Sequence, residues 1–311
     1  MDEKTLSGLD WEIVCEALHN RCHTLLGQSR ALNGDFAAGR EEALHRYTVI
    51  RELWRLDEDG EQPPVASVHD IQELSFRAEK GEVLEPEELV ETGHTLGALH
   101  RLKIWVLDRA ERAPLLQELV SPIQIDIFLL RNLEDSFDPA GELSDELYPE
   151  LRTIRVRMDQ LRHQVRSKLE SMLQDPSIAD LFQDKYITDR GGRLVLPVRV
   201  HARKAVGIVH DTSQSGETAF VEPSAVVDQQ NELKGLEAEL RRTIARILTT
   251  LSREVGENHR AIVAGLQALR LVPDHPLWMA LAIPFVCAGI LASGLVMARL
   301  SGRSTMLIRP W

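Results

Sequence analysis

Aromatic residues and cysteines are scarce in this sequence. Aromatic side chains make up 5% of it and hydrophobic residues as a whole 43%, so helices packed through Leu, Ile, Val and Ala are favoured over a β-rich fold. The three cysteines, Cys15, Cys22 and Cys287, include no CxxC pair, which excludes a disulfide framework and favours a reducing, cytoplasmic compartment. Residues 1–14 also lack the apolar core of a signal peptide, as expected of a cytoplasmic protein.

Motifs for nucleotide hydrolysis and for metal catalysis are missing as well. A P-loop reads GxxxxGK[ST], because its glycine amides cradle phosphates and its lysine reaches the phosphate oxygens. The closest string, residues 297–304, lacks the first glycine and has Arg303 in place of that lysine. His19 and His23 lie one helical turn apart, but the string HNRCH lacks the glutamate of an HExxH zinc site. We therefore expect no catalytic residue, no metal and no cofactor in this chain.

A short polar segment has the residue types of a catalytic triad: His210, Asp211, Ser213 and Ser215. Adjacent residues on a strand point to opposite faces, however, and no Gly-x-Ser-x-Gly elbow is present. Asp and Ser side chains commonly bond the amides of a loop. We therefore interpret the segment as a turn.

Residues 186–223 have the pattern of a small antiparallel sheet. The first strand is indicated by four alternating apolar residues, Leu194, Leu196, Val198 and Val200. Further strands are expected over residues 206–210 and 218–221. Residues 202–205 would then be the tip of a hairpin between the first two strands.

Two long helices flank this β unit. Apolar residues recur every three or four positions on both sides of it, as in the a and d positions of a two-helix seam. They are Leu151, Ile154, Met158, Leu161, Val165, Leu169 and Met172 upstream, and Leu233, Leu236, Leu240, Ile244, Ile247, Leu251 and Val255 downstream. A compact β unit returns the chain to where it left, so the helices are expected to pair antiparallel. The predicted fold is mainly α: a helical core bundle, a long antiparallel two-helix lever and a small inserted antiparallel β clamp.

The β unit carries a motif that resembles the clamp signature of the bacterial MutS2 proteins. The matching residues are Gly207-Ile208-Val209-His210-Asp211, Ser213, Ser215-Gly216, Thr218, Phe220 and Glu222-Pro223, with Gly192-Arg193, Leu196-Pro197-Val198 and Asn231-Glu232-Leu233 on either side. The resemblance implies a helical core (1–145), a first lever helix (146–175), a clamp (176–226), a second lever helix (227–270) and a divergent apolar tail (271–311). It also implies that the match ends before the family's P-loop ATPase and Smr nuclease domains. By itself, this chain is then expected to be no enzyme.

The end of the sequence differs from the rest in composition. Residues 277–311 contain no Asp, Glu or Lys, and residues 277–298 contain no charged residue at all. Three interpretations remain open: a transmembrane helix, since the uncharged run is long enough to span a bilayer, a terminus translated from a shifted reading frame, and a diverged beginning of the family's next domain. We favour the shifted frame, because it explains both the change in composition and the end of the resemblance.

Basic residues gather at two places in a chain whose formal net charge is −12. The clamp holds the first group, which we predict to bind nucleic acid: Arg193, Arg199, Arg203 and Lys204. The first lever helix holds a secondary basic flank: Arg152, Arg155, Arg162 and Arg166, with Arg157 and Lys168 beside them. Arg and Lys contacts to phosphates give salt-dependent, largely sequence-independent binding. The alternatives are solubilising charge on the clamp and, favoured on the lever, pairing with Glu232, Glu237 and Glu239 of the partner helix.

The resemblance implies a function in grasping nucleic acid. It implies ATP-driven clamps that serve recombination and mismatch-repair-type processes on branched DNA, or the rescue of collided ribosomes. The expected partners are duplex or branched DNA, or the ribosome and its rRNA, with a homodimer as the assembly. A membrane is a partner only if the tail spans one. The alternative function is a structural arm that grips protein or ribosome without binding DNA directly.

Overall fold

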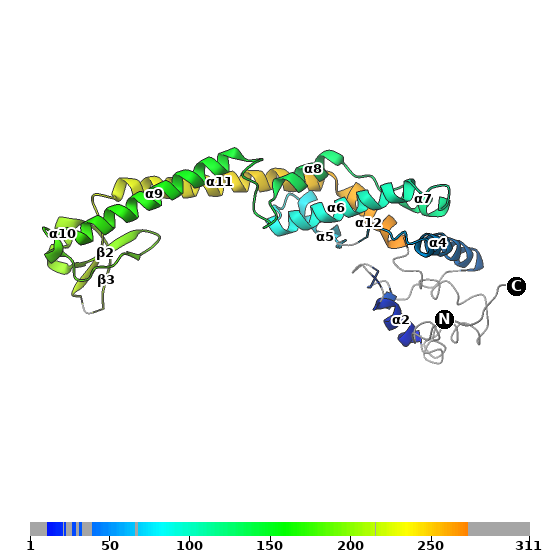
Figure 1. Ribbon diagram of the computed structural model, residues 1–311, viewed down its shortest axis with the longest axis horizontal. Helices are drawn as coiled ribbons and strands as arrows, with labels where there is room; N and C mark the ends of the chain where they lie inside the picture. Colours follow the sequence, from blue (N-terminus) through cyan, green and yellow to red (C-terminus); the bar gives the residue numbers. More distant parts are fainter. Residues whose placement is uncertain are drawn as a thin grey trace. The chain divides into compact units, whose positions relative to one another are not determined.

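The computed structural model describes residues 11–20, 22, 27–28, 31–32, 39–65, 68–214 and 216–272. These residues are mainly helical and include one four-stranded antiparallel sheet (Figure 1), which confirms the predicted fold class. They divide into two compact units. We call them the helical unit (Met1–Glu142 with Leu248–Trp311) and the arm unit (Leu143–Ile247).

The helical unit is built from helices of seven to 22 residues. They are α2 (Trp11–His19), α4 (Arg40–Glu58), α5 (Gln72–Glu79), α6 (Pro86–Leu107), α7 (Pro114–Val120), α8 (Ile127–Ser136) and α12 (His259–Leu271). Pro86 lies in the first turn of α6, where its missing N–H leaves no helical hydrogen bond unmade. The Asp126 carboxylate caps α8 by accepting from the backbone N–H groups of Phe128 and Leu129.

Polar contacts fix the packing inside the helical unit. The buried Glu52 carboxylate of α4 accepts from the backbone N–H groups of Leu115 and Leu116, at 3.2 and 2.9 Å. It thereby satisfies two amides at the start of α7 that have no partner within that helix. The Ser75 hydroxyl of α5 lies 2.9 Å from Nδ1 of His259 in α12. Each contact joins two helices that are distant in sequence.

Two long helices form the frame of the arm unit (Figure 1). The first, α9 (Pro149–Gln174), begins slightly after the expected start at residue 146, because Pro149 takes the first helical position. Its seam is buried at Leu151, Ile154, Met158, Leu161, Val165, Leu169 and Leu173. The second is α11 (Val227–Glu257), of which the arm unit holds the part up to Ile247.

Contacts between the two helices show that they run antiparallel, as predicted. Glu150 pairs with Arg246 at 3.2 Å, and Arg157 pairs with Glu232 at 2.7 Å. The Lys168 ammonium donates to the carbonyl of Ala225, just before α11 begins. From Glu150 through Arg157 to Lys168, the number of the partner residue falls from 246 to 225, as it does in an antiparallel pair.

The clamp sheet lies between these helices in sequence. Its strands are β1 (Thr188–Asp189), β2 (Leu194–Arg199), β3 (Gly207–Thr212) and β4 (Thr218–Pro223), in the spatial order β1-β2-β4-β3. All pairs are antiparallel, and Val221 of β4 lies opposite both Leu196 of β2 and Val209 of β3. Gly191 and Gly192 form the β1–β2 turn with φ of 63° and 74°, which side chains disfavour.

The expected hairpin tip at residues 202–205 is wrong, because β2 and β3 are not neighbours. The segment forms a 3-10 turn, η2 (Val200–Ala202), and a short helix, α10 (Arg203–Val206), that carries the chain past β4. The strands joined as a hairpin are instead β3 and β4. Alternation of apolar residues identifies strands but does not say which strands pair.

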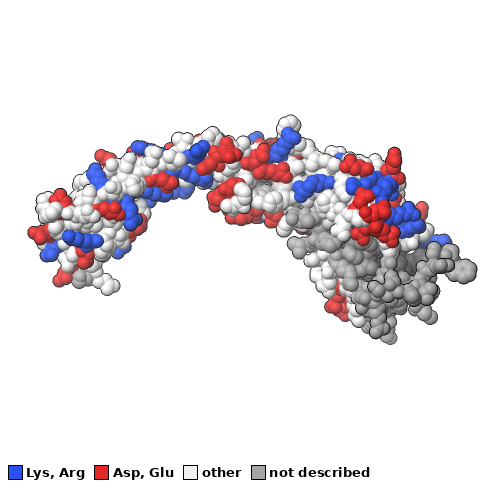
Figure 2. Space-filling view, viewed as in Figure 1, with Lys and Arg blue, Asp and Glu red and all other residues white. Residues whose placement is uncertain are grey.

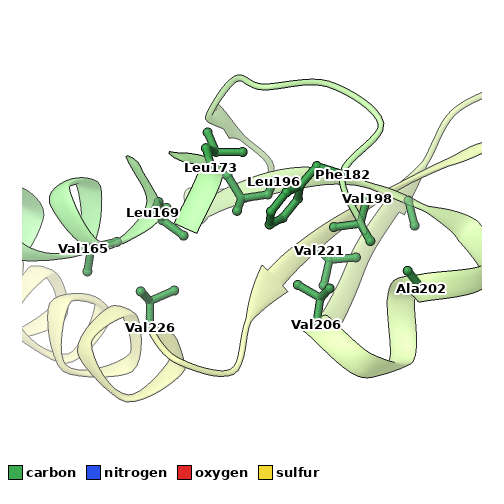
Figure 3. Close-up of a cluster of buried hydrophobic side chains, with 11 residues drawn as sticks. Val165, Leu169, Leu173, Phe182, Leu196, Val198, Ala202, Val206, Val221 and Val226 are labelled. Atoms are coloured by element: carbon green, nitrogen blue, oxygen red, sulfur yellow. The ribbon is translucent and has the colours of Figure 1, made fainter. Parts of the chain in front are cut away.

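One apolar core joins the clamp sheet to the C-terminal end of α9 (Figure 3). It consists of Val165, Leu169, Leu173, Phe182, Leu196, Val198, Ala202, Val206, Ala219, Val221 and Val226. Complete burial of a Leu or Val side chain stabilises a fold by about 1.5–3 kcal/mol. The core therefore fixes one face of the sheet against the helix, and it fixes the segment from Ala202 to Val206 on the sheet.

Candidate nucleic-acid interface

The last residue of β2 and the segment after it carry three of the four predicted clamp contacts. β2 ends at Arg199, and the buried side chains of Ala202 and Val206 anchor η2 and α10 to the core. Between these anchors, Arg203 is half-buried and Lys204 is exposed. The apolar residues of the segment thus face the core and leave its cations at the surface. We call Arg199, Arg203 and Lys204 the clamp turn.

None of the three clamp-turn cations has an ion pair with any residue that the structure describes. Arg199 is exposed, and its Nε donates to the carbonyl of Phe182 at 3.4 Å. A cation without a carboxylate partner can bind a phosphate without first breaking an existing pair. The clamp turn therefore has the charge and the exposure that a backbone contact to nucleic acid needs.

Arg193, the fourth predicted contact, lies in a polar network inside the clamp. Its guanidinium donates to Oε1 of Glu222 and to Oδ1 of Asn231, each at 2.6 Å. The Glu222 side chain is 1% exposed, and its second oxygen lies 2.6 Å from Nε2 of His210. A buried carboxylate needs such partners, because charge is costly to remove from water. The structure thus places Arg193 with β4 and α11 and away from the clamp turn.

The turn interpreted from the sequence begins later than expected, because His210 and Asp211 lie in β3 and only the residues after Thr212 leave the strand. The Asp211 carboxylate pairs with Arg190 at 3.2 Å. The Ser213 hydroxyl oxygen accepts from the backbone N–H of Thr218 at 3.1 Å. His210, Asp211 and Ser213 each have a partner outside the group, so these three do not line up as acid, base and nucleophile.

The basic flank of α9 is largely neutralised by carboxylates. Its ion pairs are Arg155–Asp145, Arg157–Glu232, Arg162–Asp159, Arg162–Glu237 and Arg166–Glu170. Pairing across the seam is therefore confirmed for Glu232 and Glu237, whereas Glu239 has no ion pair with the described residues. Exposed pairs of this kind contribute about 0–1 kcal/mol each. Arg152 is the one predicted flank residue without an ion pair in the described part of the chain.

The cations of α11 were not predicted as site residues; they are Lys234, Arg241, Arg242, Arg246 and Arg253. Lys234 pairs with Glu237 at 3.1 Å. Arg241 and Arg242 are exposed and have no ion pair among the described residues. In Figure 2, Lys and Arg side chains lie next to Asp and Glu along the helices of the arm unit. Whether a cation of the arm unit is neutralised therefore depends on its position relative to the neighbouring carboxylates.

One carboxylate of the arm unit has a shifted pKa. Asp175 ends α9, and the hydroxyl and backbone N–H of Ser177 lower the pKa of its carboxyl group below the ordinary value. Both groups donate to the same carboxylate oxygen, at 2.7 and 2.8 Å. They favour the charged form and hold the chain in a turn as it leaves the helix.

The structure leaves some predictions outside the described residues. They concern His23, Ser215, Cys287, Arg303 and the tail 273–311. Among the residues that are described, no group of three or more His, Cys, Asp or Glu residues could hold a metal ion. No described helix is both long enough and apolar enough to cross a bilayer.

Comparison with known proteins gives relatives of one kind. No family model matches the chain. The Endonuclease MutS2 of Pelotomaculum thermopropionicum is 36% identical over 273 residues, which are 86% of this chain and 34% of that protein. The Endonuclease MutS2 of Symbiobacterium thermophilum and that of an Anaeromyxobacter species are each 34% identical over 270 residues, again 86% of this chain and 34% of the relative.

The chain spans about a third of the length of the curated relatives it matches. The matched part includes most of the described residues, because it makes up 86% of the chain. The resemblance predicted from the clamp motif is therefore confirmed by whole-sequence identity. This chain belongs to the MutS2 family through a region that makes up most of its length.

Proposed function

We propose that the arm unit is the nucleic-acid-grasping, non-catalytic part of a MutS2-like protein. The observation that carries this proposal is the clamp turn, in which Arg199, Arg203 and Lys204 have no ion pair with the described residues. The core already holds this segment through Ala202 and Val206. Its cations are therefore not needed to hold the fold, and they remain available to phosphates.

The acidity of the whole chain does not oppose this function. The formal net charge is −12, but at physiological ionic strength the Debye length is about 8 Å. Carboxylates farther than this from the clamp turn are largely screened from a phosphate bound there. We expect weak, sequence-indifferent binding to be governed by the local cations.

DNA, duplex or branched, is the target that we propose first, because the relatives are named endonucleases. The process would be recombination or mismatch-repair-type repair in the cytoplasm, with the chain acting as a homodimer. If the target is instead the ribosome, the clamp turn would bind phosphates of rRNA, and the process would be the rescue of collided ribosomes. We assign no catalytic role to any described residue.

Salt titration of binding tests the proposal. The full chain is titrated with duplex DNA, branched DNA, single-stranded RNA and ribosomes, and log affinity is plotted against log salt. Each phosphate contact contributes about −0.9 to the slope on duplex DNA. The Arg203→Ala, Lys204→Ala double variant should therefore have a slope shallower by about two units.

A matched control removes two exposed cations from the helical unit, through Arg253→Ala and Arg260→Ala. It changes the net charge equally and should leave the slope unchanged. The proposal is wrong if both double variants change the slope alike, or if the unmodified chain binds none of the four probes. Preference among the probes decides between DNA and the ribosome.

A protein-gripping arm is the second candidate, and the edge of the clamp sheet favours it. Ile208 and Val209 are 51% and 41% exposed on β3, which is an edge strand. An edge strand offers unpaired N–H and C=O groups to an extended partner. This function predicts that Val209→Lys abolishes ribosome binding and leaves the salt slope for DNA unchanged. Loss of DNA binding in that variant would contradict it.

A further inference from the structure

The two sides of the α9–α11 pair differ in their ion pairs. On one side, Arg162 of α9 lies 3.7 Å from Glu237 of α11. On the other side, Glu150 and Arg157 of α9 meet Arg246 and Glu232 of α11. Residues three or four apart lie on the same side of a helix. These contacts therefore show on which side of the helix pair the neighbouring charged residues lie.

The side that contains Arg162 holds the whole predicted basic flank. The spacing 152, 155, 159, 162 and 166 repeats three and four residues, so Arg152, Arg155 and Arg166 share the side of Arg162. On α11 the spacing 234, 237 and 241 places Lys234 and Arg241 on the side of Glu237. We call this set of residues the Arg162 side.

Carboxylates neutralise most of the Arg162 side. Arg155, Arg162, Arg166 and Lys234 each have an ion pair. Arg152 and Arg241 have none among the residues that the structure describes. These two side chains therefore provide the uncompensated positive charge of this face, one from each helix.

The register of the helix pair places these two arginines at the same level. Glu150 lies opposite Arg246, and Arg157 lies opposite Glu232. Arg152 lies between Glu150 and Arg157 on α9, and Arg241 lies between Arg246 and Glu232 on α11. Both arginines are exposed.

We propose that the Arg162 side is a second contact surface for the nucleic-acid backbone, with Arg152 and Arg241 as its phosphate-binding residues. This inference rests on the proposed function of the clamp. Arginine suits the role because its planar guanidinium matches phosphate bidentately and is always charged. From Arg152 to Arg166, the face extends roughly 21 Å along the helix, about the axial length of six base pairs.

The ion pairs divide the arginines of the Arg162 side into two groups. Arg155, Arg162 and Arg166 are paired with carboxylates, whereas Arg152 and Arg241 have no ion pair with the described residues. Their positive charge is partly screened, so they guide a polyanion more weakly than Arg152 and Arg241 do. A backbone that binds the clamp turn is thereby offered a further set of cations on the same unit.

Two adjacent arginines of α11 provide a matched test. Arg241 belongs to the Arg162 side, whereas Arg242 falls on the spacing 232, 235, 239, 242 and 246, which includes Glu232 and Arg246 of the opposite side. Arg241→Glu and Arg242→Glu change the net charge equally, one residue apart, on exposed positions of one helix. Circular dichroism and thermal melting check that both variants keep the fold.

With duplex DNA as the probe, Arg241→Glu in the full chain should make the salt slope shallower by about one unit, and Arg242→Glu should not change it. Arg152→Ala with Arg241→Ala should make it shallower by about two units. Equal salt slopes for Arg241→Glu and Arg242→Glu would overturn the proposal for the Arg162 side. A shallower slope in the Arg203→Ala, Lys204→Ala double variant would still support binding by the clamp turn. If the unmodified chain does not bind duplex DNA, the face and the clamp turn are both rejected for that target.

Discussion

The lever helix α9 and the clamp turn differ in whether their cations are paired with carboxylates. On α9, the arginines Arg155, Arg157, Arg162 and Arg166 each have a carboxylate partner. On the clamp turn, three cations within six residues have none among the described residues. Most of the basic residues of α9 are therefore paired with carboxylates, whereas those of the clamp turn are not paired with any described carboxylate. A count of charges along the sequence does not distinguish paired cations from unpaired ones.

The difference follows from what surrounds each cation. An antiparallel helix pair brings a second helix alongside the first, and its flanking positions favour opposite charges. The clamp turn is anchored by two small apolar residues, Ala202 and Val206, and Lys204 between them is exposed among the described residues. The cations of the lever thus have carboxylates within reach, whereas those of the clamp turn have no ion pair with the described residues.

The largest contrast should come from two glycines. A Cβ at Gly207 would overlap the backbone of Glu222, so Gly207→Ala must separate β3 from β4 and should destabilise the arm unit by roughly 3 kcal/mol or more. Gly235 of α11 has open space around it, and Gly235→Ala should stabilise the helix by about 0.5–1 kcal/mol. Denaturant unfolding measures both. Wild-type stability in Gly207→Ala would show that the close approach is not required.

Two glutamates distinguish the inside of the clamp from the surface of the lever. Glu222→Ala leaves the Arg193 guanidinium without its buried carboxylate and should destabilise the protein by about 2–3 kcal/mol. Glu232→Ala removes an exposed pair with Arg157 and should have an effect of about 0–1 kcal/mol. Equal losses on denaturant unfolding would contradict the distinction. Glu222→Gln, which keeps the shape of the side chain and one acceptor oxygen but loses the charge, should have an intermediate effect.

The same contrast should appear when cations are removed. Arg157→Ala with Arg246→Ala breaks two interhelical pairs and should cost about 1 kcal/mol in stability. Arg203→Ala with Lys204→Ala breaks none with the described residues and should stay within about 0.5 kcal/mol. Thermal melting compares the two double variants, which carry the same charge change. A larger loss from the clamp-turn variant would mean that those cations serve the fold.

The smallest effect concerns the end of α9. Ser177 lowers the pKa of Asp175, so the charged carboxylate contributes stability above its ordinary pKa, and this contribution is lost as pH falls through the lowered value. Ser177→Ala should raise the pKa of Asp175 back toward its ordinary value. NMR titration of the carboxyl carbon measures it. An unchanged titration curve would show that the Ser177 contacts do not hold the charge.

Much of the fold could be predicted from the sequence, because its signals are local and periodic. The seam from Leu151 to Leu169 identified α9, and the two Leu-rich seams around one β unit predicted the antiparallel pair. The connection after β2 could not be predicted. Whether β2 pairs with β3 or with β4 depends on contacts between residues distant in sequence, and alternation of apolar residues contains no information about those contacts.

The candidate site could be predicted only in part, for a related reason. Arg193 has the same chemical type as Arg203, but its partner Glu222 lies 29 residues away in sequence. Local spacing therefore could not show that Arg193 pairs with a buried carboxylate of the clamp. Arg241 was missed because its relation to Arg152 depends on the register between two helices. Periodicity within one helix does not fix that register, whereas the ion pairs across the seam do.

Lysine footprinting tests the central claim most directly. The full chain is acylated with a lysine reagent, with and without saturating duplex DNA or ribosomes, and mass spectrometry compares Lys204 on the clamp turn with Lys80 in the helical unit, both of which are exposed. If the clamp turn contacts phosphates, bound nucleic acid should slow the acylation of Lys204 and leave Lys80 unchanged, and raising the salt concentration should remove the protection. Acylation of Lys204 at an undiminished rate in the saturated complex would contradict the account.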